Sequence, residues 1–243
     1  NKHRYIDEIL YIYNRTNPLN DDKVDHSMQL GFEREIRGKD KYDKISHGTD
    51  PLDLLNSKRF DIAAKTIYAR NRMKNTDSEF PVELYLEHLK VWNNLYEKSP
   101  EKIGEKSFID AFDNLLSDIN TNGFDANKGK IPTIQGSAIN GAHRIASSIV
   151  TANEVQTYEG KISEGQYNCN FQYFKNKNNF VDTGLGEIYL DEMALEFCRN
   201  KSNLYTITIF PSHDIDVANI LSHINKKNEI IYCKKVTLDN HGK

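Results

Sequence analysis

The stretch from residue 106 to residue 153 constrains the fold of this chain most, because two different periodicities follow each other in it. Residues 106–120 are apolar at helical spacing, which predicts an amphipathic helix, and an Asn-Gly pair ends it. Two short apolar runs, 131–134 and 137–139, then predict strands around a tight turn. A second helix is expected directly afterwards, at 143–153. This order of elements indicates a mixed architecture.

The segments before this stretch are mostly helical in pattern. Residues 1–57 form a distinct opening segment, with a polar helix expected at 22–38 and a capped turn into a short helix at 49–56. Residues 58–75 mix helical and extended signals. Pro81 then opens a clear helix over 81–97.

The segments after it are more varied. A polar loop is expected at 156–168, and the alternating residues of 169–174 predict a strand. A helix follows at 187–199. The last predicted unit is strand–helix–strand, at 205–210, 214–226 and 229–238.

Together these elements predict an α+β fold of mixed α/β character, with helices around a small mixed sheet. We expect three parts. Residues 1–57 form a helical linker, 58–180 form the core, and 181–243 form an α/β extension packed on that core. The absence of an initiating methionine suggests a piece of a longer, multidomain polypeptide.

Composition narrows the class of protein. The chain has 243 residues, 38% of them apolar, which is enough for a sizeable core. A net charge of -3 argues against a basic nucleic-acid-binding domain, so a nucleic-acid partner is not expected. No run of about 18 apolar residues predicts a membrane span, and no signal peptide is recognised, so the expected location is the cytoplasm. Three scattered cysteines indicate neither a zinc ribbon nor a disulfide framework.

The sequence Gly141-Ala142-His143-Arg144 is the clearest candidate site. Asn140 and Gly141 both tolerate positive φ and allow a sharp turn from strand to helix. His143 and Arg144 then fall in the first helical turn, where a cation opposes the helix dipole. An anion bound at that helix start would explain both side chains, with Arg144 donating two hydrogen bonds. The alternative is a histidine packed under a turn and an arginine that reaches an acidic neighbour.

This region resembles the core of the ParB/sulfiredoxin fold. The resemblance lies in the helix FIDAFDNLLSDI, the strand IPTI, the strand SAIN and the run GAHRIASSIV. Family members open the last helix with a G-x-H-R or G-x-R-R motif that holds nucleotide phosphates. The resemblance implies that Asn140, Gly141, Ala142, His143 and Arg144 bind the phosphates of ATP or ADP, with Mg²⁺, as in the free-serine-kinase branch.

Ala142 is the informative departure from that pattern. Sulfiredoxins carry their reactive cysteine at this position, and this chain has alanine. Sulfinic acid reduction is therefore not expected, whereas nucleotide binding and phosphotransfer are.

Other polar residues complete the expected site. Lys106 and Ser107 stand at a helix start, where they would reach a phosphate or cap the helix, unless they belong to a solvated face. A kinase also needs a carboxylate near the acceptor hydroxyl. The candidate carboxylates are Asp61, Glu105, Asp182, Glu187 and Asp191. The residues expected to bind an anionic acceptor are Lys65, Arg70 and Arg72, for which a solvated face is the alternative.

The opening segment resembles the tail that follows the catalytic domain of some bacterial family-2, GT-A fold glycosyltransferases. The residues that carry this resemblance are Tyr11, Tyr13, Asn14, Arg15, Gln29, Ile36 and Arg37. It implies a parent enzyme of surface-polysaccharide synthesis, with this piece covalently linked to further domains.

The leading hypothesis is a nucleotide-dependent phosphotransferase, a kinase acting on a hydroxyl of a sugar, polyol, glycan or small metabolite. Two alternatives belong to other classes. One is a ParB-like module that binds CTP or DNA or acts as a nuclease, and the other is a noncatalytic scaffold domain of a polysaccharide polymerase.

Overall fold

A computed structural model describes residues 42–98, 101–160 and 169–201, with Leu204, Ile224 and 230–233; for 42–47 and 160 only the backbone is described. The chain divides into two units, Val24–Leu204 and Asn1–Lys23 with Tyr205–Lys243. Nearly all the described residues belong to the first unit. The helix expected at 22–38, the glycosyltransferase-like residues and most of the strand–helix–strand unit lie outside them.

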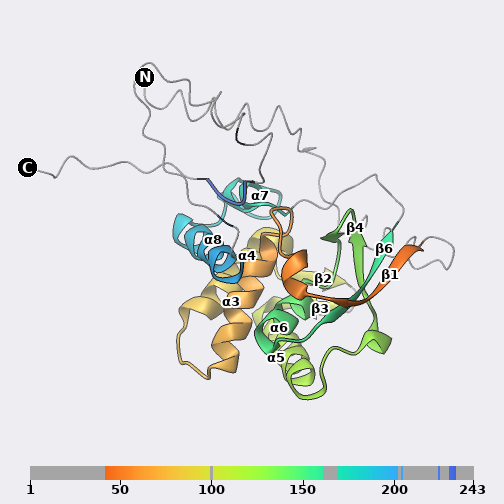
Figure 1. Cartoon of the computed structure of the whole chain (residues 1–243). Helices are drawn as coiled ribbons and strands as arrows, with labels where there is room; N and C mark the ends of the chain where they lie inside the picture. The colour runs from red at the N-terminus through yellow and green to blue at the C-terminus, as the bar shows by residue number, and fades with distance from the viewer. Residues whose placement is uncertain are drawn as a thin grey trace, which may run out of the picture. The chain divides into compact units, whose positions relative to one another are not determined.

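The described part has an α+β fold, as the sequence predicts (Figure 1). The helices are α3 (Asp61–Met73), α4 (Phe80–Asn93), α5 (Gly104–Asn122), α6 (Ala142–Thr151), α7 (Phe171–Lys175) and α8 (Glu187–Asn200). The strands are β1 (Tyr42–Thr49), β2 (Tyr96–Lys98), β3 (Glu101–Ile103), β4 (Ile131–Ile134), β5 (Ser137–Ala138) and β6 (Val155–Gly160). Two short 3₁₀ helices are η1 (Pro51–Leu54) and η2 (Ala126–Lys128).

Four strands form a mixed sheet in the order β1-β6-β4-β5. β4 and β6 are parallel, whereas β1 pairs with β6 and β5 pairs with β4 in antiparallel fashion. A connection between parallel neighbours requires a crossover, and α6 lies within it. The start of α6 therefore follows directly from β5 at the edge of the sheet. A separate hairpin, β2–β3, precedes α5.

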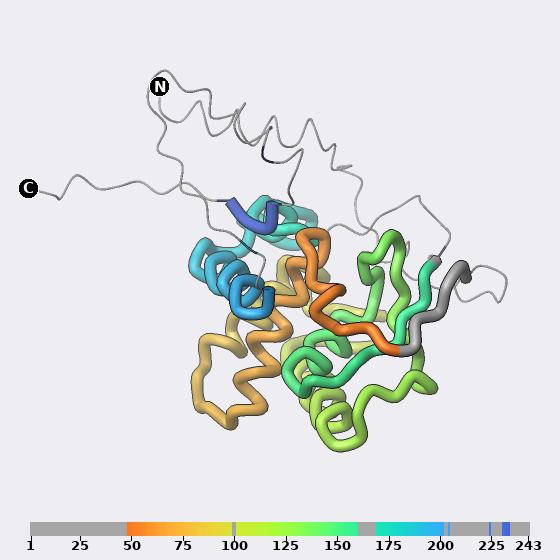
Figure 2. The backbone as a smooth tube through the Cα atoms, viewed as in Figure 1, coloured from red at the N-terminus to blue at the C-terminus, as the bar shows by residue number. Residues whose placement is uncertain are grey.

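Helix α3 lies at the centre of the helical layer and is buried on nearly all sides. It packs against α4, α6 and α8 (Figures 1 and 2). Ala63, Ala64 and Ala69 have no exposed surface, and such small side chains allow neighbouring helices to approach closely. Around them, Tyr68 contacts the rings of Tyr85 and Phe112 at centroid distances of 4.5 and 5.1 Å. This aromatic cluster joins α3, α4 and α5.

The helices expected at 81–97, 106–120, 143–153 and 187–199 are present with small shifts in their ends. Two other predictions are wrong. The loop expected at 156–168 contains strand β6, which pairs with β4 although its residues include polar ones. The strand expected at 169–174 is instead helix α7, because the Asn170 side chain accepts from the amide of Tyr173 and caps a helical turn.

The first unit also includes elements from outside the predicted core. β1 and η1 lie within the segment 1–57, and β1 pairs with β6. α8 lies within 181–243 and packs on α3, where Phe197 stacks on Phe60 at 5.5 Å.

Candidate functional site

Three charged side chains at the start of α3 form a buried cluster. Arg59 binds Asp61 through two hydrogen bonds, each of 2.9 Å, one to each carboxylate oxygen. Lys65, one turn further along the helix, donates to the same carboxylate at 2.8 Å. The three residues are only 2%, 3% and 4% exposed, respectively. Two cations therefore share one carboxylate inside the protein.

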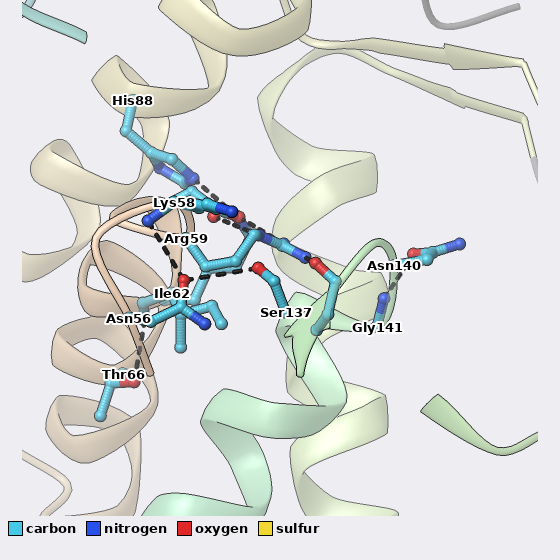
Figure 3. A network of polar contacts seen from close by, with 12 residues as sticks. Asn56, Lys58, Arg59, Ile62, Thr66, His88, Ser137, Asn140 and Gly141 are labelled. Atoms are coloured by element: carbon cyan, nitrogen blue, oxygen red, sulfur yellow. Dashed lines mark hydrogen bonds and ion pairs between the residues drawn. The ribbon is translucent and has the colours of Figure 1, made fainter. Parts of the chain in front are cut away.

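The loop before α3 holds Arg59 in place (Figure 3). Its Nη1 donates to the backbone oxygen of Ala138 in β5 at 2.5 Å, and its backbone forms a bridge with Cys169. Nearby, Asn56 Oδ1 accepts from the amide of Lys58 and lies 3.4 Å from Ser137 Oγ. The guanidinium group is thus fixed against the sheet before helix α3 begins.

His88 of α4 is the second partner of Lys65. Its Nε2 lies 3.1 Å from Lys65 Nζ, while its Nδ1 contacts the backbone oxygen of Tyr85. A carbonyl accepts, so Nδ1 carries the proton and Nε2 accepts from Lys65. Burial and the neighbouring Lys65 hold the pKa of His88 well below its usual value, which keeps the ring neutral. Two of the three Lys65 N–H bonds are used in this way.

A small cavity of about 60 Å³ lies beside this cluster, between five elements of the fold. Seven of its lining residues are buried: Arg59, Asp61, Lys65, Leu89, Asn93, Phe108 and Ala142. Four are partly exposed: Trp92, Glu97, Asn140 and His143.

His143 lies in the first turn of α6. Its Nε2 lies 2.9 Å from the Tyr85 hydroxyl, and its ring meets Phe112 edge-on at 4.6 Å. Burial, followed by the charges of Lys65 and Lys102, holds the pKa of His143 well below its usual value. Within the described residues Nδ1 has no hydrogen-bond partner. This nitrogen is available to a ligand in the cavity.

Charged side chains of both signs line the cavity. Burial alone would raise the pKa of Asp61, but Arg59 and Lys65 hold it far below its usual value, so the carboxylate is ionised. Burial lowers the pKa of Lys65, and Asp61 opposes that effect. The other carboxylate in the lining, Glu97, forms an ion pair with Lys102. Two buried cations and one shared carboxylate thus line the same cavity.

The structure brings together five of the residues that the sequence singles out. Asp61, Lys65, Asn140, Ala142 and His143 all line the cavity. Gly141 stands between them as the N-cap of α6, with a φ of 85°. A Cβ at this position would lie 2.6 Å from Ile131 Cδ1, so both the backbone conformation and the space require glycine.

Other candidate residues lie away from the cavity. Arg144 donates to the backbone oxygen of Gly129 and lies 5.9 Å from the centre of the Phe124 ring. Lys106 pairs with Asp110 on the exposed face of α5, and Ser107 donates to backbone oxygens of its own helix start.

The remaining acidic and basic candidates lie elsewhere, and two of them, Arg72 and Glu105, line a second and larger cavity of about 540 Å³. Glu105 lies 3.4 Å from Lys90, and Asp182 lies 3.6 Å from Lys177 on an exposed loop. Glu187 begins α8 and is exposed, and Asp191 lies one turn further along α8. Arg70 pairs with Glu196 at 2.7 Å, and Arg72 pairs with Asp113 at 3.2 Å. None of these residues lines the smaller cavity.

Sequence reasoning missed Arg59, His88, Trp92 and Glu97 as site residues. A signal for Arg59 was present, because Arg59, Asp61 and Lys65 stand within a run whose other residues are almost all apolar. Charges in such a run are buried together and need one another as partners. Glu97 belongs to the hairpin β2–β3, which the sequence did not predict.

No helix in the described part of the chain is long and apolar enough to cross a membrane. Among the same residues, no group of three or more His, Cys, Asp or Glu side chains is arranged to hold a metal ion. Comparisons with protein-family models, with curated proteins and with solved structures find no match to this chain.

Proposed function

We propose that this protein is a nucleotide-dependent phosphotransferase whose phosphate-binding site is the cavity at the start of α6. The observation that carries the proposal is the pair of buried cations, Arg59 and Lys65, which share one carboxylate beside a polar cavity. The resemblance of 106–153 to the ParB/sulfiredoxin core agrees with this role and is part of the proposal. The acceptor is a hydroxyl of a sugar, polyol or small metabolite, in the setting of surface-polysaccharide synthesis.

Each lining residue has a distinct part in binding the phosphate. Arg59 and Lys65 supply the charge, and Lys65 still has one N–H bond for a ligand oxygen. His143 donates through Nδ1 if its neutral ring takes that tautomer and accepts from Tyr85 at Nε2. The backbone amides at the start of α6 add the partial positive charge of a helix N-terminus.

Glu97 is the carboxylate that we assign as base. Asp61 accepts three hydrogen bonds from Arg59 and Lys65, and its low pKa makes it a poor proton acceptor. In Glu97 only Oε2 is paired, with Lys102, and the side chain is 32% exposed. The acceptor hydroxyl gives its proton to Glu97 as its oxygen bonds to the terminal phosphorus. The bond from that phosphorus to the bridging oxygen breaks, and the shortened nucleotide leaves.

Mg²⁺ belongs to this proposal as a companion of the nucleotide. Mg²⁺ often keeps several waters and binds largely through substrate phosphates, so here it would be held chiefly by the phosphates of the nucleotide. When bound, the ion neutralises phosphate charge.

A binding experiment tests the phosphate site. Trp92 lines the cavity and is the only tryptophan of the chain, so its fluorescence reports on ligand binding. Titrations with ATP, ADP and CTP should give saturable changes, and Lys65→Met should weaken binding about tenfold or more. Lys106→Met is the matched control, since Lys106 is exposed and lies outside the cavity. Absence of binding by all three nucleotides would overturn the proposal.

A transfer experiment tests the reaction. The protein is incubated with ATP labelled at the terminal phosphate, Mg²⁺ and a panel of sugars and polyols. Labelled phosphate on a hydroxyl compound supports the phosphotransferase. Nucleotide binding without transfer to any acceptor would instead indicate a noncatalytic nucleotide-binding domain.

A further inference from the structure

Tyr85 of α4 contacts both histidines of the site, each through a different oxygen. Its hydroxyl lies 2.9 Å from Nε2 of His143, and its backbone oxygen contacts Nδ1 of His88. We propose that Tyr85 is a positioning residue whose hydroxyl holds the ring proton of His143 on Nδ1, so that a neutral histidine offers a hydrogen-bond donor to the ligand in the cavity. The place of this proton follows from the contacts of the two side chains, whereas its part in ligand binding rests on the proposed function.

The Tyr85 hydroxyl has to donate its proton. Tyr85 has no exposed surface, so bulk water does not reach this group. Burial raises the pKa of the phenol well above its usual value, and the oxygen therefore keeps its proton. In the described part of the chain, Nε2 of His143 is the only hydrogen-bond partner of the hydroxyl. A buried O–H group without an acceptor is costly, so Tyr85 donates to Nε2.

The proton of His143 then lies on Nδ1. Burial, followed by the charges of Lys65 and Lys102, holds the pKa of His143 well below its usual value, so the ring is neutral. A neutral imidazole has one N–H group and one acceptor nitrogen, and here the acceptor is Nε2. In the opposite tautomer, Nε2 would donate to the Tyr85 oxygen, and the proton of the buried hydroxyl would have no acceptor.

Nδ1 of His143 is unpaired but is not sealed inside the protein. Among the described residues, the buried polar side-chain atoms without a partner belong to four other residues. His143 itself is partly exposed and lines the cavity. A ligand that meets this N–H group has to present an atom that accepts a hydrogen bond. A phosphate oxygen does so, whereas an ammonium group has only donors.

His88 has the same tautomer for a different reason. Its Nδ1 donates to the backbone oxygen of Tyr85, and its Nε2 accepts from Lys65. A side-chain substitution of Tyr85 leaves that backbone oxygen in place. The two histidines therefore distinguish the effect of the hydroxyl from the effect of the main chain at the same residue.

Nitrogen NMR of the chain with isotope-labelled histidine tests the place of the proton. Protonated and unprotonated ring nitrogens resonate far apart, and His143→Gln and His88→Gln identify the two sets of signals. We expect a protonated Nδ1 in His143 of the unaltered chain. Tyr85→Phe removes only the hydroxyl, so the ratio of the Nδ1–H to the Nε2–H tautomer of His143 should fall about tenfold. His88 should stay protonated on Nδ1 in the same variant.

Tyr68→Phe is the matched control for the loss of a hydroxyl. Tyr68 belongs to the same aromatic cluster, with its ring 4.5 Å from that of Tyr85, but its hydroxyl donates to Asp113. This variant should leave the tautomers of both histidines unchanged. A melting curve shows that each variant is folded, and the measurement on the unaltered chain does not depend on any variant.

ATP titration, read from Trp92 fluorescence, tests the part of this proton in binding. Tyr85→Phe should weaken ATP binding about three- to tenfold, the effect of one hydrogen bond. In His143→Asn, an amide nitrogen takes roughly the place of Nδ1 and donates without help from Tyr85. Adding Tyr85→Phe to His143→Asn should therefore weaken binding no further.

The outcomes separate this inference from the proposed function. A proton on Nε2 of His143 in the unaltered chain would overturn the inference and leave the phosphate site in place. An equal loss of ATP affinity from Tyr85→Phe in both backgrounds would show that Tyr85 acts through packing, and it would overturn the positioning role. A proton on Nδ1 without binding of ATP, ADP or CTP would overturn the proposed function while the place of the proton stands.

Discussion

At the scale of single residues, the most consequential feature is the carboxylate of Asp61 between two cations. Burying three charges is costly, and each is tolerated only because its partners remain. Stability and ligand binding therefore depend on the same side chains. Asp61 stabilises the buried cluster, whereas Glu97 is the carboxylate that we expect to contact the acceptor.

Replacing Asp61 should destabilise the fold strongly. Asp61→Asn removes the carboxylate charge that Arg59 and Lys65 share inside the protein, and breaking a buried ion pair in this way costs about 3–5 kcal/mol. The free energy of unfolding is measured by urea denaturation. Asp110→Asn, which removes the exposed partner of Lys106, is the control and should change stability far less. Equal losses in the two variants would contradict the role given to the cluster.

Replacing Glu97 should separate binding from transfer. Glu97→Gln keeps the size of the side chain but removes the base, so phosphate transfer should fall about 10²–10⁴-fold. Nucleotide affinity, read from Trp92 fluorescence, should change little, because the cations of the cavity are intact. Glu105→Gln serves as the control, since Glu105 was a candidate base that lies outside the cavity. Unchanged transfer in Glu97→Gln would exclude it as the base.

At the scale of elements, the turn between β5 and α6 is the part whose conformation depends most on one residue, Gly141. Gly141 adopts a φ of 85° and has Ile131, a buried residue of β4, directly against it. Gly136, in the turn between β4 and β5, also has a positive φ of 72°, but nothing lies within 4 Å of a Cβ placed there. A comparison of substitutions at these two glycines therefore separates the effect of backbone strain from the effect of a steric clash.

Alanine at these glycines should have unequal effects. Gly136→Ala introduces backbone strain alone, which is about 1–2 kcal/mol for a left-handed residue. Gly141→Ala adds a clash with Ile131 and should destabilise further, and it should also weaken phosphate binding by displacing His143. Urea denaturation and Trp92 fluorescence measure the two effects. An equal loss of stability in both variants would show that Ile131 moves aside.

The same elements show how far sequence reasoning reaches. Helices α5 and α6 and the strands between them were predictable, because their apolar spacing and glycines act locally. β6 was not predictable from its own residues, several of which are polar. It is a strand because it pairs with β4, a parallel neighbour that is distant in sequence. Of the site, His143 and Gly141 follow from a local motif. Arg59, His88 and Glu97 meet only through tertiary packing, and Arg144 turns away because the Gly129 carbonyl accepts its hydrogen bond.

At the scale of the described unit, two histidines tie stability to pH. The pKa values of His88 and His143 are held well below their usual value, chiefly by burial. In the unfolded chain both take up protons as pH falls through about 6.5, whereas in the folded chain they stay neutral. The unfolded state then binds more protons, so stability falls as the pH drops.

The free energy of unfolding should therefore decrease between pH 7 and pH 5. The slope should reach up to about 1.4 kcal/mol per pH unit for each histidine once the pH lies below the unfolded pKa. Urea denaturation at a series of pH values measures it. His143→Gln should reduce this slope, and a slope that stays unchanged would show that His143 titrates alike in both states.

The contact between Arg59 and Ala138 also has a consequence for the order of folding. These residues are 79 positions apart in the chain, and the bridge from Arg59 to Cys169 spans a still longer loop. During synthesis the guanidinium group cannot make its contact with the sheet until β5 has emerged. The charged cluster is then among the last parts to close, because loop closure over such separations is slow. A nascent chain that stops before Ala138 lacks this acceptor for Arg59 and also lacks Asn140, Ala142 and His143, so it should have a hydrated Arg59 and no formed cavity.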